Sequence, residues 1–184
     1  MKNNLYKMLA VLIVFTLAAC QPETPTKTVA TTEFFKNQPG KWITVLAPKD
    51  WVAVQKSGSA PAVIVTNDQK GYFSTNTKAI GILITPLADQ GSAEDALQAA
   101  IKRLGNALTT PVGEVALEQA AGQSYASIEY DGLSAEQEGM PAHYFLAVIS
   151  TSQRSVLVFS AVDPDQAGLT RPAYQSVLKG ITLH

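Results

Sequence analysis

The chain has 184 residues, of which 46% are apolar, 16% charged and 8% aromatic. This composition excludes a disordered protein, and the length indicates one compact domain. The formal net charge is −1, and Lys and Arg do not form runs. The sequence therefore lacks the clustered positive surface that nucleic-acid binding requires, and we expect no nucleic-acid partner.

The N-terminus consists of a short basic segment followed by an apolar run. Lys2 and Lys7 flank the start, and ten mainly apolar residues follow from Met8 to Leu17. A membrane-spanning helix needs about 20 apolar residues, so this run has the length of a signal peptide. It ends in Leu17-Ala18-Ala19-Cys20, which resembles the lipobox of bacterial lipoproteins, where the cysteine thiol carries diacylglycerol. We expect residues 1–19 to be a signal peptide and Cys20 to be lipidated; the alternative is an ordinary signal peptide with an unrelated cysteine.

Lipidation would leave no cysteine for a disulfide, because Cys20 is the only one in the chain. The mature chain would have 165 residues, and a domain of this size buries roughly 70% of the surface that its unfolded chain exposes. It would carry 12 basic and 15 acidic side chains, a formal charge of −3. We therefore expect acyl chains, not attraction to anionic lipid, to hold the protein at the membrane.

The segment after the cysteine has few residues to bury. Residues 21–33 (QPETPTKTVATTE) contain two prolines and five threonines. This composition predicts that residues 20–33 form a flexible tether, the alternative being an ordered edge segment. The globular domain is then expected over residues 34–184.

Two helices are predicted from spacing and capping signals. Ser92 precedes two acidic residues and an apolar stripe at helical spacing that reaches Leu108, so the first helix should begin at Ser92. The second helix should begin near Thr170, hold Pro172 in its first turn and stop at Gly180. The residues expected to face the core are Ala96, Leu97, Ala100, Ile101, Leu104 and Leu108 in the first helix, and Ala173, Val177 and Leu178 in the second.

Eight segments have strand-like patterns, and two of them are apolar at successive positions over 144–149 and 156–159. Successive strand residues point to opposite faces, so both faces of these strands must be covered. In contrast, Tyr125, Ser127 and Glu129 alternate with apolar residues, which indicates one wetter face. We expect an α+β fold: a mainly antiparallel sheet with helices on both faces, an α-β-α sandwich. The predicted strands are Trp42–Leu46, Trp51–Gln55, Ala62–Thr66, Ala79–Thr85, Gly113–Gln119, Gln123–Tyr130, Ala142–Thr151 and Ser155–Val162.

The order of these elements resembles the PsbP-like fold, which an extrinsic photosystem II subunit shares with a Ran-binding nuclear-import factor and many bacterial lipoproteins. The resemblance covers about Phe34 to Leu183 and includes an opening Leu46-Ala47-Pro48-Lys49-Asp50-Trp51, the Ser92 helix, a block of four strands and a closing helix that ends in the segment Tyr174–Ile181. Asp50 stands where such proteins commonly have glycine. The resemblance implies an α-β-α sandwich and an accessory, assembly or binding role, with no activity and no binding residue carried over.

The sequence lacks a recognisable catalytic motif. The segment around Ser124 lacks the last glycine of a nucleophile elbow and precedes a strand, not a helix. Ser124, Asp131 and His143 follow the chain order of some hydrolase triads, but we favour a turn serine and an unrelated strand histidine and do not predict a triad. Phosphate-binding and dinucleotide-binding glycine motifs are also missing from the sequence.

Acidic residues gather in and beside the loop that follows residue 130. Asp131, Glu136 and Glu138 lie near His143, and oxygen ligands with one imidazole suit a divalent cation. Their spacing matches no defined metal site, so we interpret the segment as a solvated acidic loop and predict no metal or other cofactor.

Aromatic residues supply the other candidates for a contact surface. Trp42 and Trp51 lie among apolar strand residues, which favours a core position over a ligand groove for at least one of them. Tyr72 and Phe73 lie in a polar stretch, where exposed aromatic side chains commonly contact partners, although packing back on the sheet is the alternative.

These patterns together predict a lipid-anchored, extracytoplasmic accessory protein that binds or helps assemble a membrane-associated partner and is not an enzyme. Its location would be the bacterial cell envelope, and Gln21 after the cysteine suits the periplasmic face of an outer membrane where one exists. The alternatives are a small-ligand or metal-binding module and an unrecognised hydrolase. The candidate partner surface consists of Tyr72, Phe73, Asp131, Glu136 and Glu138.

Overall fold

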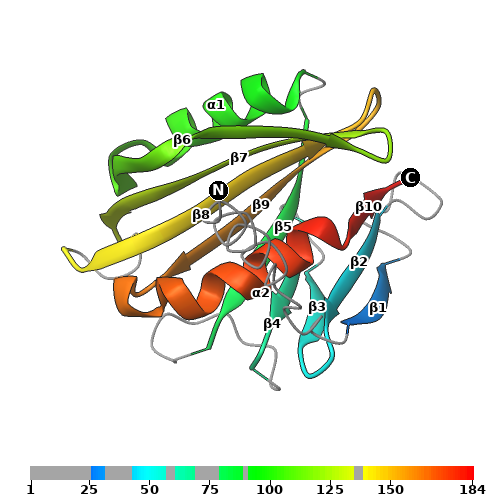
Figure 1. The fold of residues 1–184 in the computed structure, drawn as a ribbon, viewed down its shortest axis with the longest axis horizontal. Coiled ribbons are helices and arrows are strands. Elements are labelled where there is room, and N and C mark those ends of the chain that lie inside the picture. Colours follow the sequence, from blue (N-terminus) through cyan, green and yellow to red (C-terminus); the bar gives the residue numbers. More distant parts are fainter. Residues whose placement is uncertain (1–25, 32–42, 57–60, 69–78, 89–90, 135–138) are drawn as a thin grey trace, which may run out of the picture.

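The part of the chain that the structure describes forms two antiparallel sheets and two α-helices (Figure 1). The computed structural model describes residues 26–31, 43–56, 61–68, 79–88, 91–134 and 139–184, with only the backbone of the first segment. The helices are α1 (Ala93–Leu104) and α2 (Ala167–Lys179), with short 3-10 turns η1 (Gly105–Ala107) and η2 (Pro164–Gln166). The strands are β1 (Thr26–Thr31), β2 (Ile43–Pro48), β3 (Val52–Lys56), β4 (Ala62–Thr66), β5 (Gly81–Leu87), β6 (Leu108–Ala120), β7 (Gln123–Leu133), β8 (Pro141–Ser150), β9 (Ser155–Val162) and β10 (Ile181–Leu183).

The larger sheet has seven strands in the order β3-β4-β5-β9-β8-β7-β6, and the smaller sheet has the order β1-β2-β10. Neighbouring strands in both sheets are antiparallel. The predicted α+β class with a mainly antiparallel sheet is confirmed. All eight predicted strands are present, β4 and β9 with the predicted bounds and the other six with shifted ends. The second sheet was not predicted, because it pairs β2 with β1 and β10 from the two ends of the chain.

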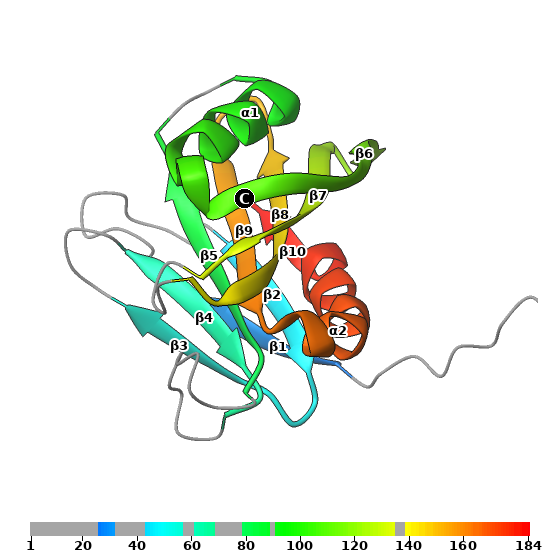
Figure 2. The same cartoon turned by 90° about the vertical axis from the view of Figure 1, so that its left-hand side faces the viewer.

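The two helices cover opposite faces of the larger sheet, as predicted (Figure 2). Tyr144, Leu146 and Val148 of β8 face α1, whereas Phe145 and the alternate residues after it face α2 and the smaller sheet. Every residue of β8 after Pro141 is buried. The expectation that both faces of this strand are covered is therefore confirmed.

Helix α1 follows its sequence prediction closely. The Ser92 hydroxyl accepts a hydrogen bond from the Asp95 backbone N–H at 3.0 Å, so Ser92 is the N-cap. The helix ends at Leu104, and Gly105 follows with a positive φ of 54°. Leu108, predicted as the last helical core residue, instead opens strand β6, because the helix has already ended at this glycine.

Helix α2 begins at Ala167, three residues before the predicted start near Thr170. The η2 turn leads directly into the helix, so the chain is already helical when it reaches Thr170. The buried Thr170 hydroxyl donates to the Gln166 carbonyl at 2.9 Å, a bond within the helix and not a cap. Pro172 consequently lies inside the helix, not in its first turn, and the prediction of its position was wrong.

Part of the predicted tether is a strand. Residues 26–31 form β1, which pairs with β2 from Thr26 opposite Pro48 to Thr31 opposite Ile43. The tether prediction is therefore wrong for these six residues, and the alternative of an ordered edge segment describes them. Threonine is β-branched and favours extended backbone. The threonine-rich composition of this segment therefore suits an edge strand, although it has few apolar side chains to bury. Residues 20–25 and 32–33 of the predicted tether, like the signal peptide, lie outside the described residues.

A buried glutamine joins the two sheets near the C-terminus. The Gln123 amide nitrogen donates to the Ile181 carbonyl at 3.1 Å and to the Tyr125 hydroxyl at 2.6 Å, while its oxygen accepts from the Leu183 N–H at 2.6 Å. The side-chain amide of Gln123 in β7 thus makes the hydrogen bonds that the backbone of a neighbouring strand would otherwise make to β10.

We expect Gln123→Ala to lower the free energy of unfolding by about 2–3 kcal/mol, because two buried backbone groups of β10 lose their partners. Urea unfolding of the purified domain measures this loss. Gln119→Ala, on the exposed strand β6, is the matched control and should leave stability unchanged. Equal effects of the two substitutions would show that the amide does not secure β10.

Candidate functional site

Four charged side chains meet where β7 and β8 lie beneath α2. Glu129 and Asp131 are two residues apart on β7, and His143 of β8 pairs directly with Asp131. These positions therefore share the sheet face that α2 covers. Arg171 of α2 reaches the same point from above the sheet. We call these four residues the charged cluster.

The charged cluster is joined by four short contacts. Arg171 Nε and an Nη donate to the two Glu129 carboxylate oxygens at 2.8 and 2.7 Å, a two-pronged pair. His143 Nε2 lies 2.8 Å from Glu129 Oε2, and His143 Nδ1 lies 2.7 Å from Asp131 Oδ1.

Aromatic rings form the floor of the charged cluster. The His143 ring meets the buried Phe145 ring edge-on with centroids 4.9 Å apart, and the Arg171 guanidinium carbon lies 5.8 Å from the same centroid. The Tyr174 ring also packs against the Phe145 ring, with centroids 5.2 Å apart, and the Tyr174 hydroxyl donates to the Val158 carbonyl at 2.9 Å. These contacts place the His143 ring and the Arg171 guanidinium against one apolar ring, that of Phe145.

Burial falls across the charged cluster from its centre to its edge. The side chains of His143 and Glu129 are 7% and 23% exposed, whereas those of Arg171 and Asp131 are 42% and 60% exposed. The inner pair thus positions two outer charges that solvent, or another molecule, can reach.

The electrostatics follow from these contacts. The hydrogen bond from Arg171 lowers the pKa of Glu129 and outweighs the opposite effect of burial, with a smaller lowering from His143. The same bond raises the pKa of Arg171. Burial, assisted by the negative charge of Glu129, raises the pKa of Tyr174 well above its ordinary value, so this phenol stays protonated.

The lowered pKa of Glu129 predicts the pH dependence of stability. A carboxyl whose pKa is lower in the folded state stabilises the fold above its unfolded pKa of about 4.3, and this contribution is lost as the pH falls through the folded value. We expect Glu129→Gln to destabilise the domain by about 1–2 kcal/mol at pH 7 and by much less at pH 3. Urea unfolding at both pH values, with the exposed Glu118→Gln as control, measures the difference. A loss that is equal at both pH values would contradict this electrostatic origin.

The structure brings together two of the residues that the sequence singled out and separates a third from them. Asp131 and His143 are bonded, but Ser124 pairs with Ser150 on the opposite sheet face and lies seven residues along β7 from Asp131, about 23 Å away. A Ser124-Asp131-His143 triad therefore does not form. Trp51 is half-buried against the core, as the favoured interpretation expected. The predicted residues outside the described part of the chain are Cys20, Trp42, Tyr72, Phe73, Glu136 and Glu138.

Sequence reasoning missed Glu129 and Arg171 as site residues. The alternation of Tyr125, Ser127 and Glu129 did indicate the face on which Glu129 lies. Arg171 follows Glu129 by 42 residues, and only the packing of α2 on the sheet brings the two side chains together. No local motif marks such a pair.

Within the described ranges, no group of three or more His, Cys, Asp or Glu side chains is arranged to hold a metal ion. The geometry of the charged cluster also does not suit a metal ion. The two His143 nitrogens point to different carboxylates, and Arg171 occupies both oxygens of Glu129. Among the same described residues, no helix has both the length and the hydrophobicity to cross a membrane.

Comparisons with known proteins identify the fold by structure alone. No family model matches the sequence, and no curated protein matches it at the sequence level. The cyanobacterial PsbP (CyanoP) of Synechocystis superposes with a TM-score of 0.54 at 14% identity, over 91% of this chain and 99% of CyanoP. The Ran-binding protein Mog1p of Saccharomyces cerevisiae gives 0.56 at 13% identity, over 87% and 96% of the two chains.

A third similar structure comes from a cell-envelope context. LpqN of Mycobacterium tuberculosis, described as involved in cell envelope biogenesis, gives a TM-score of 0.55 at 15% identity, over 86% of this chain and 91% of LpqN. The chain spans only 48% of a similar Bacteroides thetaiotaomicron protein, with a TM-score of 0.52 and 14% identity. At these identities the likeness concerns the fold and carries no residue roles. The chain thus has the α+β fold of PsbP-like domains, with a charged cluster on the sheet face beneath α2.

Proposed function

We propose that this protein is a lipid-anchored accessory protein of the bacterial cell envelope that binds a membrane-associated protein partner and catalyses no reaction. The proposal combines the predicted lipidation of Cys20 with a fold that also occurs in CyanoP, a Ran-binding protein and a protein of cell envelope biogenesis. Where the organism has an outer membrane, its periplasmic face is the proposed location, because Gln21 follows the cysteine.

The arrangement of the charged cluster is the observation that carries this proposal. Both oxygens of Glu129 and both nitrogens of His143 are already engaged within the cluster. A general base needs a free atom within reach of its substrate, whereas these atoms hold one another in place. The exposed charges of Asp131 and Arg171 are thereby fixed in position, which suits recognition of a complementary charged surface.

The proposed partner surface therefore centres on Asp131 and Arg171. Tyr72, Phe73, Glu136 and Glu138 remain further candidates from the sequence alone. Fixing charged side chains before binding lowers the entropy that association costs. An ordered pair of opposite charges also selects the orientation of a partner more than it adds raw affinity.

Cross-linking in intact cells, followed by affinity purification, tests this surface. We expect Asp131→Asn to reduce recovery of the cross-linked partner several-fold, because it removes the most exposed charge of the charged cluster with little change in shape. Glu118→Gln removes a carboxylate from the exposed strand β6 and should leave recovery unchanged. Equal recovery with both variants, at equal protein levels, would place the partner elsewhere.

A further inference from the structure

The start of strand β1 marks one end of the molecule. Thr26 pairs with Pro48 at the end of β2, and the turn over Lys49 and Asp50 follows directly. The first described residue of the chain therefore lies beside the turn between β2 and β3.

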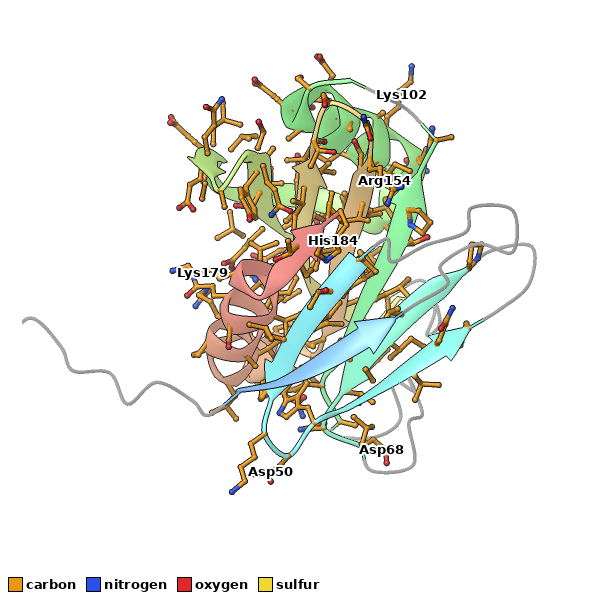
Figure 3. The ribbon with its side chains drawn as sticks, turned by 90° about the vertical axis from the view of Figure 1, so that its right-hand side faces the viewer. Asp50, Asp68, Lys102, Arg154, Lys179 and His184 are labelled. Atoms are coloured by element: carbon orange, nitrogen blue, oxygen red, sulfur yellow. The ribbon has the colours of Figure 1, made fainter. Side chains whose placement is uncertain are left out.

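The end of β4 lies at the same place in the fold. Val52, which opens β3, pairs with Thr66, so the chain leaves the sheet here through Asn67 and Asp68. Figure 3 shows Asp50 and Asp68 along one edge of the molecule and Lys102 at the opposite edge. Arg154, in the turn between β8 and β9 (residues 151–154, the β8–β9 turn), lies toward the edge that holds Lys102. We call residues 48–50 with residues 67–68 the β2–β3 end.

Few residues separate this end from the predicted lipid anchor. Only residues 21–25 lie between Cys20 and Thr26, because β1 begins at Thr26, within the predicted tether. A chain of this length spans at most about 20 Å whatever its conformation. A compact domain of about 150 residues has a radius of gyration near 15 Å, so its diameter, on the order of 40 Å, exceeds the reach of this link.

We infer that the domain stands on the membrane with the β2–β3 end toward the lipid headgroups and the β8–β9 turn facing away. The inference rests on the proposed lipidation of Cys20 and adds an orientation to it. The bilayer excludes the volume of the domain, and the short link keeps the start of β1 close to the lipid. Rotations that turn the β8–β9 turn toward the bilayer would carry the start of β1 beyond the reach of the link.

The composition of the β2–β3 end predicts proximity to headgroups without insertion. Its charged residues are the exposed Lys49 and Asp50 and the half-buried Asp68, a set that does not favour an anionic surface. The exposed large hydrophobic residues of the described chain all lie elsewhere: Val54, Val112, Leu117, Leu133, Met140 and Leu169. The link, and not adhesion of this end, therefore sets the orientation.

Two single-cysteine variants of the full lipidated chain test the orientation. Lys49→Cys places a fluorescent label at the β2–β3 end, and Gln153→Cys places it in the exposed β8–β9 turn. Lipidation occupies Cys20, so each variant has one free thiol. In zwitterionic vesicles with a nitroxide on the lipid headgroup, we expect quenching at residue 49 to exceed that at residue 153 several-fold. Equal quenching, or stronger quenching at residue 153, would overturn the orientation.

A longer link provides a second test that does not depend on the labelled positions. Insertion of about 20 Gly and Ser residues between Pro25 and Thr26 should bring the quenching ratio close to one. An unchanged ratio would overturn the claim that the short link orients the domain.

Mass spectrometry of the mature chain shows whether Cys20 is acylated, and so distinguishes a failure of the orientation from a failure of the proposed lipid anchor. An acylated Cys20 with equal quenching at both labels would refute the orientation alone. An unmodified Cys20 would refute both the anchor and the orientation that depends on it. Thermal unfolding of each labelled variant confirms that the label has not disturbed the fold.

Discussion

Gly132→Ala is expected to lower the free energy of unfolding by about 3 kcal/mol, the largest loss of stability that we predict for a single substitution. A Cβ at Gly132 would lie 1.9 Å from the Ala107 carbonyl oxygen and 3.1 Å from the Tyr144 ring. The obstacle is the backbone of η1, which a side-chain rotation cannot move away. The turn after α1 would have to separate from β7, and the start of β6 would follow it.

Thermal unfolding measures this loss, which should lower the melting temperature by roughly 6–12 °C for a domain of this size. Gly168→Ala is the matched control, because a Cβ there meets no atom within 4 Å and the residue lies in the exposed first turn of α2. Alanine favours helix over glycine by up to about 1 kcal/mol, so this control should be neutral or stabilising. Similar losses in the two variants would contradict the close approach of η1 to β7.

Loss of the lipid anchor is the largest functional effect that we predict. The change combines Cys20→Ser with an ordinary cleavable signal peptide in place of residues 1–19, so that export continues without acylation. The protein should move from the membrane fraction to the soluble fraction almost completely. Two or more acyl chains hold a protein stably, whereas the mature domain has a side-chain charge of −3 and little attraction to lipid of its own.

Cell fractionation followed by immunodetection measures the shift. The natural chain, washed in high salt, is the control and should stay with the membrane, because salt screens charges but does not extract acyl chains. A variant that remains fully membrane-bound after signal cleavage would contradict anchoring through Cys20.

The elements that could be predicted from sequence are those fixed by local signals. Helix α1 has its N-cap at Ser92 and an apolar stripe that starts within the first turn. Strands β8 and β9 are apolar on successive residues, which required cover on both faces. The start of α2 was misplaced because the η2 turn, which precedes it, has no apolar periodicity to reveal it.

The parts that could not be predicted depend on contacts between distant segments. Strand β1 is held by pairing with β2, and its sequence alone resembles a polar linker. Arg171 and Glu129 meet only because α2 packs on β8 and β9, beside β7, whereas Asp131 and His143 belong to one hairpin and were noticed together. The sequence therefore indicated two of the four residues of the charged cluster, Asp131 and His143, which belong to one hairpin.

Cross-linking in intact cells, with the natural chain compared with the released Cys20→Ser form, tests most directly whether this protein is an anchored binding partner at the envelope. We predict that a defined membrane-associated protein is recovered reproducibly with the natural chain and several-fold less with the released form at equal expression. Failure to recover any protein reproducibly with the natural chain, or equal recovery with both forms, would contradict an anchored accessory role.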